Sequence, residues 1–167
     1  MLMNSPKVKI NIIGLFLFFA IVITATSVFT KYWIVFKSPI FGVIANVGIV
    51  PYHSNQGGWF KAASILMYIS LALFGPLILV YFGACFKIYR HGCYHEVRSA
   101  FNLISLLCSV ITLFELIAFF LFVINSFHSS DGLNEQIGSS AYLAMASAIL
   151  LGIPVAFSSH ISRNDCH

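Results

Sequence analysis

The sequence predicts an all-α membrane protein: a four-transmembrane-helix bundle with a candidate small β-sheet in the first extracellular loop. The main observation is a set of four long apolar runs, at about 10–30, 62–86, 101–125 and 139–159. About 20 apolar residues in a helix, each adding about 1.5 Å, match a hydrocarbon core of roughly 30 Å. The chain is also 59% hydrophobic and only 8% charged, with a mean hydropathy of +0.93.

This composition excludes most classes of soluble protein. Soluble domains carry about 25% charged residues, and a soluble fold of 167 residues has too little interior to cover so much apolar surface. The nine Lys and Arg residues give a formal net charge of +4, but they are scattered and form no basic stripe of the kind that binds nucleic acid. We therefore expect a single membrane domain over residues 1–167, in contact with membrane lipids and not with nucleic acid.

The first apolar run resembles a signal peptide at its two ends. Lys7 and Lys9 give it a basic start, and residues 25–27 (Ala-Thr-Ser) have the small side chains of a cleavage site. Its apolar stretch is longer than a usual signal core, so we expect it to be retained as the first span.

The distribution of basic residues predicts that both termini are cytoplasmic. Lys and Arg concentrate in the cytoplasmic segments next to a membrane. With this orientation, the two tails and the connection at 87–100 hold six of the nine Lys and Arg residues, and the loops at 31–61 and 126–138 hold the other three. The prediction is a multi-pass protein of the plasma membrane with a long first and a short second extracellular loop.

The first predicted extracellular loop carries a Trp near each end and apolar segments between them. Trp prefers the membrane interface, so Trp33 and Trp59 are predicted to be interfacial anchors. The segments 40–45 and 47–50 are apolar and rich in β-branched residues, which predicts short strands. A small sheet of two or more strands is favoured over an irregular loop along the interface. An exposed apolar strand is also a candidate for pairing with the edge of a neighbour.

Three local features accompany this layout of four spans, a long first loop and a short second loop. Trp33 follows the first span, Phe41 and Gly42 lie in the first loop, and residues 61–67 (Lys-Ala-Ala-Ser-Ile-Leu-Met) open the second span. On these features the chain resembles the claudin and peripheral myelin protein superfamily, which includes calcium-channel gamma subunits and other receptor accessory proteins. That family has a W-GLW-C-C signature after the first span and a QAARALM-like segment at the second. Phe41 and Gly42 stand at the GLW element, of which only the glycine is kept.

The cysteine pair of the family signature is absent, because residues 30–60 contain no Cys. In the family, a disulfide ties two strands of the outer sheet. Here the sheet would depend on its hydrogen bonds, on lipid and on partners, since a small sheet is marginally stable alone. This departure favours an accessory role over claudin-type self-assembly or ion-selective pores.

The cysteines lie outside the predicted extracellular loops, so no structural disulfide is expected. Cys85, Cys93 and Cys166 lie beside the membrane and are candidate palmitoylation sites, with ordinary reduced thiols as the alternative. The His-Gly-Cys-Tyr-His segment at 91–95 lacks the full ligand set of a metal site. No nucleophile–base set or phosphate loop is present, so we predict no catalytic, cofactor-binding or metal-binding residues.

Glu115 is the one acidic residue deep in a predicted span. A charge at that depth costs roughly 3 kcal/mol even on lenient insertion scales, so the side chain should face the bundle interior or be protonated. Cys108, Thr112 and Glu115 follow i, i+4, i+7 spacing and share one helix face. One interpretation is a site that couples a proton, an ion or a partner. The favoured interpretation is an interhelical hydrogen bond, with four candidate partners: Thr24, Thr26, Tyr68 and Tyr142.

The fourth span contains a ridge of small residues. Ser140, Ala144, Ala148 and Gly152 recur at every fourth position. Helices in lipid associate where small side chains let their backbones approach. This small-residue ridge is predicted to pack inside the bundle, with docking of a partner's helix as the alternative.

The leading functional prediction is a non-enzymatic, claudin-like tetraspan protein. It would act as an accessory subunit of a channel or receptor complex, or as a cell-adhesion or junction component. Its partners would be other membrane proteins or copies of itself, contacted through Trp33, Phe41, Gly42, Trp59 and the small-residue ridge. The alternative is a small oligomeric ion channel or transporter that uses an intramembrane polar site at Glu115 and Thr112.

Overall fold

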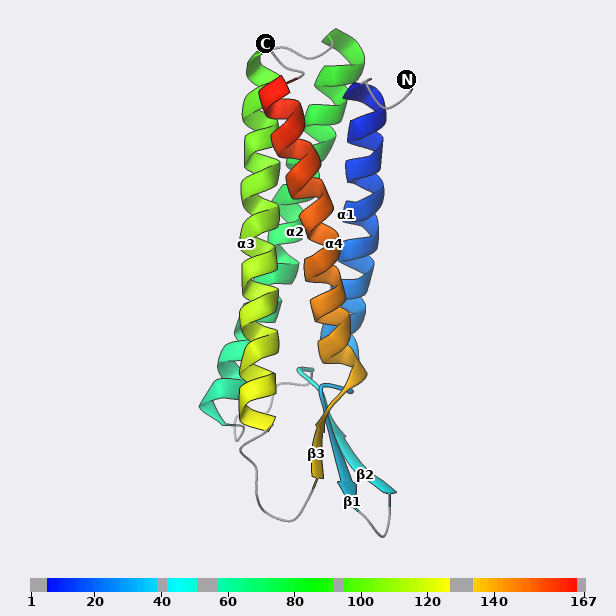
Figure 1. Ribbon diagram of the computed structural model, residues 1–167, viewed down its shortest axis with the longest axis vertical. Coiled ribbons are helices and arrows are strands. Elements are labelled where there is room, and N and C mark those ends of the chain that lie inside the picture. Colours follow the sequence, from blue (N-terminus) through cyan, green and yellow to red (C-terminus); the bar gives the residue numbers. More distant parts are fainter. Residues whose placement is uncertain (1–5, 39–41, 51–56, 92–94, 127–133, 165–167) are drawn as a thin grey trace.

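The computed structural model describes residues 6–38, 42–50, 57–91, 95–126 and 134–164. The described residues form four helices: α1 (Pro6–Phe29), α2 (Gly58–His91), α3 (His95–Ser126) and α4 (Ser139–Asn164). Three short strands lie in the connections: β1 (Ile34–Ser38), β2 (Gly42–Val47) and β3 (Asn134–Ile137). The helices run alongside one another, and the strands project from the end of the bundle opposite the start of α1 and the end of α4 (Figure 1).

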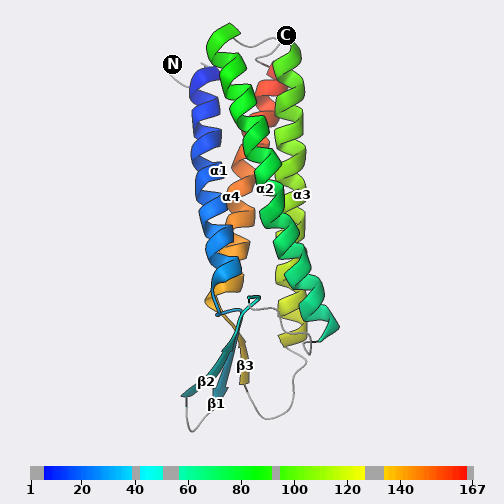
Figure 2. The same cartoon turned by 180° about the vertical axis from the view of Figure 1, so that it is seen from behind.

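Each helix contains a stretch that is long and apolar enough to cross a membrane: Val8–Phe29, Gly58–Arg90, Val97–Asn125 and Ser139–Arg163. This confirms the predicted bundle of four spans. α4 packs against both α1 and α3, and α3 packs against α2. The helices α1 and α2 separate toward the sheet, as the rear view shows (Figure 2).

The helices extend past the predicted apolar runs. α2 continues to His91 and α3 begins at His95, so both reach into the segment 87–100 that hydropathy assigns to a connection. A helix satisfies its own backbone hydrogen bonds, and it can therefore continue into the headgroup zone with long basic side chains on it. Arg90 illustrates this, because its guanidinium carbon lies 4.6 Å from the centroid of the Phe86 ring.

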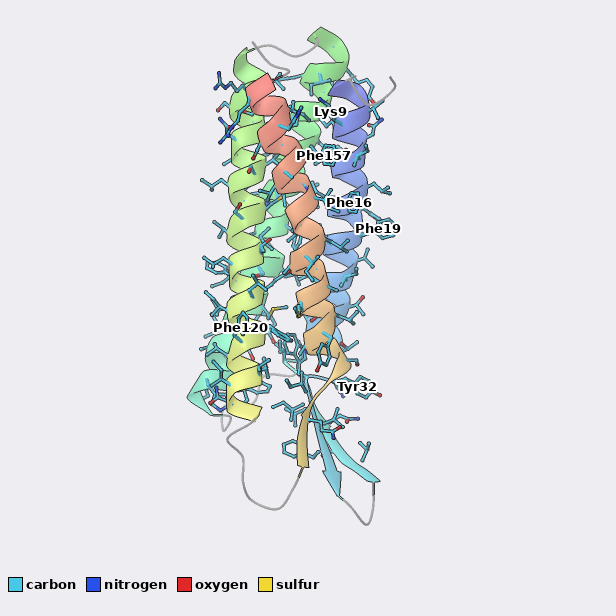
Figure 3. All side chains as sticks on the ribbon, viewed as in Figure 1. Lys9, Phe16, Phe19, Tyr32, Phe120 and Phe157 are labelled. Atoms are coloured by element: carbon cyan, nitrogen blue, oxygen red, sulfur yellow. The ribbon has the colours of Figure 1, made fainter. Side chains whose placement is uncertain are left out.

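The outer surface of the bundle is apolar on every helix. Large side chains on all four helices are more than half exposed: Phe18, Leu79, Phe82, Leu106, Ile124 and Ile149. Phe19 likewise projects from the side of α1 (Figure 3). Helices that are apolar all round are typical of membrane spans. The apolar outer surface of the four helices is therefore consistent with their prediction as membrane spans.

The predicted small sheet is present, with three antiparallel strands in the order β2-β1-β3. β1 occupies the centre: its Ile34 lies opposite Val47 of β2 and opposite Ile137 of β3. A bulge interrupts the β1–β2 register between Phe36 and Lys37. The sheet therefore joins the long connection after α1 to the short connection before α4.

The strand positions correct the sequence-based assignment in two places. The predicted strand at 40–45 overlaps β2, whereas 47–50 holds only the last residue of β2 and then leaves the sheet. β1 and β3 have no predicted counterpart. The sequence of β3, Asn-Glu-Gln-Ile, lacks apolar alternation and has only one β-branched residue, Ile137. It becomes a strand because it pairs with β1, and such context often overrides intrinsic β-propensity.

The buried interior consists of two clusters at different depths. The terminal-end core lies toward the chain termini and includes Ala20, Phe74, Leu77, Phe101, Cys108, Ile111, Leu151 and Ile161. The sheet-side core lies at the end of the bundle next to the strands and includes Val28, Trp33, Phe60, Met67, Ala118, Phe122, Ala141 and Ala144.

Candidate functional site

Glu115 on α3 is the centre of a polar contact between three helices. Its side chain has no exposed surface. Thr24 Oγ1 on α1 donates a 2.7 Å hydrogen bond to Glu115 Oε1. Ser147 Oγ on α4 lies 2.6 Å from Thr24 Oγ1 and 3.5 Å from Glu115 Oε1. One carboxylate oxygen thus links α1, α3 and α4.

Of the four candidate partners of Glu115, only Thr24 makes the predicted bond. Thr26 bonds back to its own helix, Tyr68 donates to a backbone carbonyl of the β2–α2 connection, and Tyr142 is 54% exposed. Sequence reasoning missed the serine of α4 in this cluster. α4 contains several serines, and only the relative depth at which the helices pack places Ser147, and not another of them, beside the carboxylate.

The predicted polar face of α3 is buried, and part of its hydrogen-bonding capacity is unused. Cys108 lies in the terminal-end core. Thr112 Oγ1 and Glu115 Oε2 are buried and bond to no group among the described residues. A buried polar atom without a partner costs about 1–3 kcal/mol. These two oxygens therefore need an explanation beyond interhelical hydrogen bonding.

The small-residue ridge of α4 faces the bundle along most of its length. Ser140, Ala144 and Ala148 are buried, whereas Gly152 is exposed. The Ser140 carbonyl accepts a 2.8 Å hydrogen bond from Ser27 Oγ of α1. The first three members of the ridge thus pack within the bundle, and Gly152 faces outward.

Trp33 joins the sheet to the bundle. Its side chain is fully buried, and its Nε1–H donates a 2.8 Å hydrogen bond to the Ser27 carbonyl. The ring centroid lies 4.6 Å from that of Phe122 on α3. Trp59, which is partly buried, approaches the same ring at 5.4 Å. The interfacial-anchor prediction is therefore wrong for Trp33, because its ring fills the space between the helices beneath the sheet.

Among the described residues, no strand pairs with the outer edge of β2, which is the open edge of the sheet. Gly42 begins this strand, and Phe41 lies outside the described residues. The Val47 carbonyl accepts a 3.0 Å hydrogen bond from Trp33 N and therefore faces β1. Successive residues of a strand turn their backbone groups to opposite edges. The backbone N–H and C=O of Asn46 consequently face away from β1.

The candidate modification and metal sites are only partly visible. Cys85 lies partly buried in α2, whereas Cys93 and Cys166 lie outside the described residues. In the described part of the chain, no three His, Cys, Asp or Glu side chains form a group that could hold a metal ion. Palmitoylation of the three cysteines stays a prediction.

A groove lies on the outer surface of α3. It has a volume of about 430 Å³ and is lined by Asn102, Ser105, Leu106, Ser109, Val110 and Leu113. The Asn102 carboxamide accepts a 2.6 Å hydrogen bond from Ser162 of α4, and Ser109 donates to the Ser105 carbonyl of its own helix. The groove places amide and hydroxyl groups on a surface that is otherwise apolar.

Replacing Thr24 with Val is expected to lower the free energy of unfolding by about 1–2 kcal/mol, because Glu115 loses its hydrogen-bond donor. The measurement is thermal unfolding of the purified protein in detergent. Thr26→Val is the matched control, since this hydroxyl is exposed and bonds to its own helix; it should change stability by less than about 0.5 kcal/mol. Equal losses in the two variants would show that the Thr24–Glu115 bond contributes nothing.

The whole fold falls within one family match. A family model described as "Tight junction protein, Claudin-like" matches residues 3–167. A comparison with curated proteins found no match. The matched range contains all four helices and all three strands, so the likeness is not limited to the apolar spans.

Proposed function

Since the chain belongs to the claudin-like family of tight junction proteins, we propose that it is a non-enzymatic junction component that binds copies of itself through the open edge of its sheet. The family assignment and the four apolar helices make it a multi-pass membrane protein. Its proposed place is the plasma membrane, with both termini cytoplasmic and the sheet outside the cell. This orientation follows from the bias of basic residues toward the tails and the α2–α3 connection.

The open edge of β2 is the observation that carries this proposal. An unpaired edge offers backbone donors and acceptors to a strand of another chain. Val43 on β2 is 54% exposed, and Asn46 directs its backbone groups outward. A second copy with the same edge can add to it in antiparallel fashion. The edge therefore provides both hydrogen bonds and apolar contact for self-association.

The sheet is held in place without the disulfide of the family. β1 is paired on both sides, by β2 and by β3. The Trp33 ring and its bond to Ser27 hold the start of β1 against the helices. These contacts are the structural reason to favour a junction role over the accessory role that the absent cysteines suggested.

Asn46→Pro is expected to lower self-association at least about tenfold while the fold persists. Proline removes the outward N–H and is tolerated on an edge strand where that N–H does not bond within the sheet. The measurement is aggregation of vesicles that carry the purified protein in their membranes, together with sedimentation of the protein in detergent.

Asn46→Ala is the control for this test, because it removes the side-chain amide and keeps the backbone donor. It should assemble like the unchanged protein. Assembly that survives Asn46→Pro would contradict the edge-pairing proposal, whereas equal loss in both variants would assign the contact to the side chain.

The groove on α3 favours a second candidate function, that of an accessory subunit. Asn102 Oδ1 and the Ser105 hydroxyl already bond to Ser162 and Ser159 of α4. The NH2 group of Asn102, which is an exposed residue, can still donate to a further helix that packs on this surface. A channel, receptor or adhesion protein that docks there would co-purify with the Asn46→Pro variant as well as with the unchanged protein. Co-purification of such a subunit, combined with vesicles that do not aggregate, would favour the accessory role.

The channel alternative has less structural support. Glu115 has no exposed surface and is bonded to Thr24. A conducting state would require a different arrangement of α1, α3 and α4.

A further inference from the structure

The groove on the outer surface of α3 has the length of one bilayer leaflet. It begins at Asn102, close to the start of the apolar stretch Val97–Asn125, and ends at Leu113, near the middle of that stretch. The helix rises about 16 Å between these two residues, which is about half of a hydrocarbon core of roughly 30 Å. The groove therefore extends from the headgroup level to the centre of the membrane.

The lining of the groove consists of two rows of side chains. Spacings of three and four residues keep each row on one side of the helix. A polar row is formed by Asn102, Ser105 and Ser109, and an apolar row by Leu106, Val110 and Leu113. The two leucines are more than half exposed. An apolar chain in the groove would therefore contact aliphatic side chains along its whole length.

The polar row is held in place by α4. Ser105 Oγ lies 3.2 Å from Ser159 Oγ, and Ser162 Oγ donates a 2.6 Å hydrogen bond to Asn102 Oδ1. This bond uses the acceptor of the Asn102 carboxamide and leaves its NH2 group as a donor. Because Asn102 is an exposed residue, its NH2 group can donate to a ligand at the outer end of the groove.

Two exposed arginines lie at this outer end. Arg98 precedes Asn102 by one helical turn on α3, and Arg163 follows Ser159 by one turn on α4. The two contacts between α3 and α4 run antiparallel, which places Arg163 level with residue 101 and Arg98 about 4–5 Å further outward. Neither guanidinium forms a hydrogen bond or an ion pair in the described part of the chain. The outer end of the groove therefore carries two positive charges that are free to bind an anion.

We propose that this groove binds one anionic phospholipid, with its phosphate between Arg98 and Arg163 and one acyl chain along the apolar row. Guanidinium groups bind phosphate through strong charge-assisted hydrogen bonds. The NH2 group of Asn102 lies one turn deeper, at the level where it can donate to an ester carbonyl of the same lipid. The proposal does not depend on the junction role. It places the lipid in the cytoplasmic leaflet, which is rich in anionic lipids, only if the orientation proposed above is correct.

Charge favours a lipid over a partner helix as the occupant. A helix could pack on the polar row, but it would have to bring acidic side chains to the membrane surface to pair with Arg98 and Arg163. An anionic phospholipid brings the negative charge and the apolar chain in one molecule, at the separation that the groove requires. Basic sites between helices at a membrane surface bind such headgroups.

Native mass spectrometry of the full chain in detergent tests this site, with phosphatidylserine and phosphatidylcholine of the same acyl chains as probes. Phosphatidylserine should form a one-lipid complex and bind at least about tenfold more tightly than phosphatidylcholine. Arg98→Gln and Arg163→Gln should each weaken the binding of phosphatidylserine about fivefold. Ser109→Leu should weaken it at least about tenfold, because the larger side chain fills the groove while both arginines remain.

Two matched variants separate this site from general surface charge and from a general effect of substitution. Arg90→Gln removes the same charge from α2, where the guanidinium packs on Phe86, and should bind phosphatidylserine like the unchanged protein. Ser109→Ala keeps the groove open and should do the same. An equal loss in Arg90→Gln and Arg98→Gln would overturn the proposal, as would full binding in Ser109→Leu.

Two further results would also contradict a lipid in the groove. Inorganic phosphate carries the headgroup charge without a chain, so displacement of phosphatidylserine by equimolar phosphate would show that the groove contributes nothing. Purification of the unchanged protein with a second protein chain that Ser109→Leu loses would assign the groove to a helix. Equal affinities of the unchanged protein for the two lipids would remove the role of the arginines and overturn the proposal.

Discussion

Replacing Trp33 with Ala is expected to lower the free energy of unfolding by about 3–5 kcal/mol, the cost of deleting a large buried aromatic side chain. The ring has no exposed surface and contacts Phe122 at a centroid distance of 4.6 Å. Its loss leaves a cavity between α1 and α3 and removes the indole donor from the Ser27 carbonyl, which keeps only a 3.3 Å contact with Thr30 Oγ1. For a protein of this size the expected fall in melting temperature is about 10 °C, measured by circular dichroism in detergent.

Two further variants separate the causes of that loss. Trp33→Phe keeps an aromatic ring but removes the bond to Ser27 and leaves a small cavity, so its cost should be about 1–3 kcal/mol, less than that of Trp33→Ala. Tyr32→Ala is the control, because this neighbouring ring is 50% exposed and lies in the connection between α1 and β1 (Figure 3). A loss in Tyr32→Ala as large as that in Trp33→Ala would show that the joint does not depend on the buried indole.

The sequence predicts the spans well because hydropathy reports a property of each segment alone. The same is true of the burial of Glu115, since the cost of a charge in lipid forces that side chain inward whatever its partner is. Thr24 could be proposed as a partner because, of the hydroxyl-bearing residues in the first span, it lies nearest to the middle of the apolar run. Its contact with Ser147 could not, because it depends on how far α4 slides along α1.

The sheet, and the contact of Trp33 that joins the sheet to the bundle, could be found only from the structure. Interfacial preference describes an average Trp, and Trp33 departs from it because the diverging helices leave a space that its ring fills. β3 is polar and short, and only its pairing with β1 makes it a strand. Both features depend on contacts between segments about 100 residues apart, such as Ile34 with Ile137. Local patterns along the chain do not contain that information.

Gly138 lies where these distant segments approach each other closely. Gly138→Ala is expected to destabilise the protein by about 3 kcal/mol, at the upper end of overpacking costs. Its N–H donates a 2.9 Å hydrogen bond to the Trp33 carbonyl. A Cβ at this position would overlap the backbone oxygen of Tyr32. Because that oxygen also accepts from Ser140 N at 3.0 Å, it cannot move without breaking the link between β1 and α4. Thermal unfolding and amide hydrogen exchange of β1 and β3 would measure the loss.

Two other glycines provide the contrast that makes this expectation specific. A Cβ at Gly152 meets nothing within 4 Å, so Gly152→Ala should be neutral or should stabilise α4 by about 0.5–1 kcal/mol. A Cβ at Gly14 would overlap the Tyr81 hydroxyl, which is the end of a side chain that can turn aside, and Gly14→Ala should cost less than Gly138→Ala. The order of the three effects therefore follows the rigidity of the atom that each methyl meets. Similar losses for Gly138→Ala and Gly14→Ala would contradict this account of the joint between sheet and bundle.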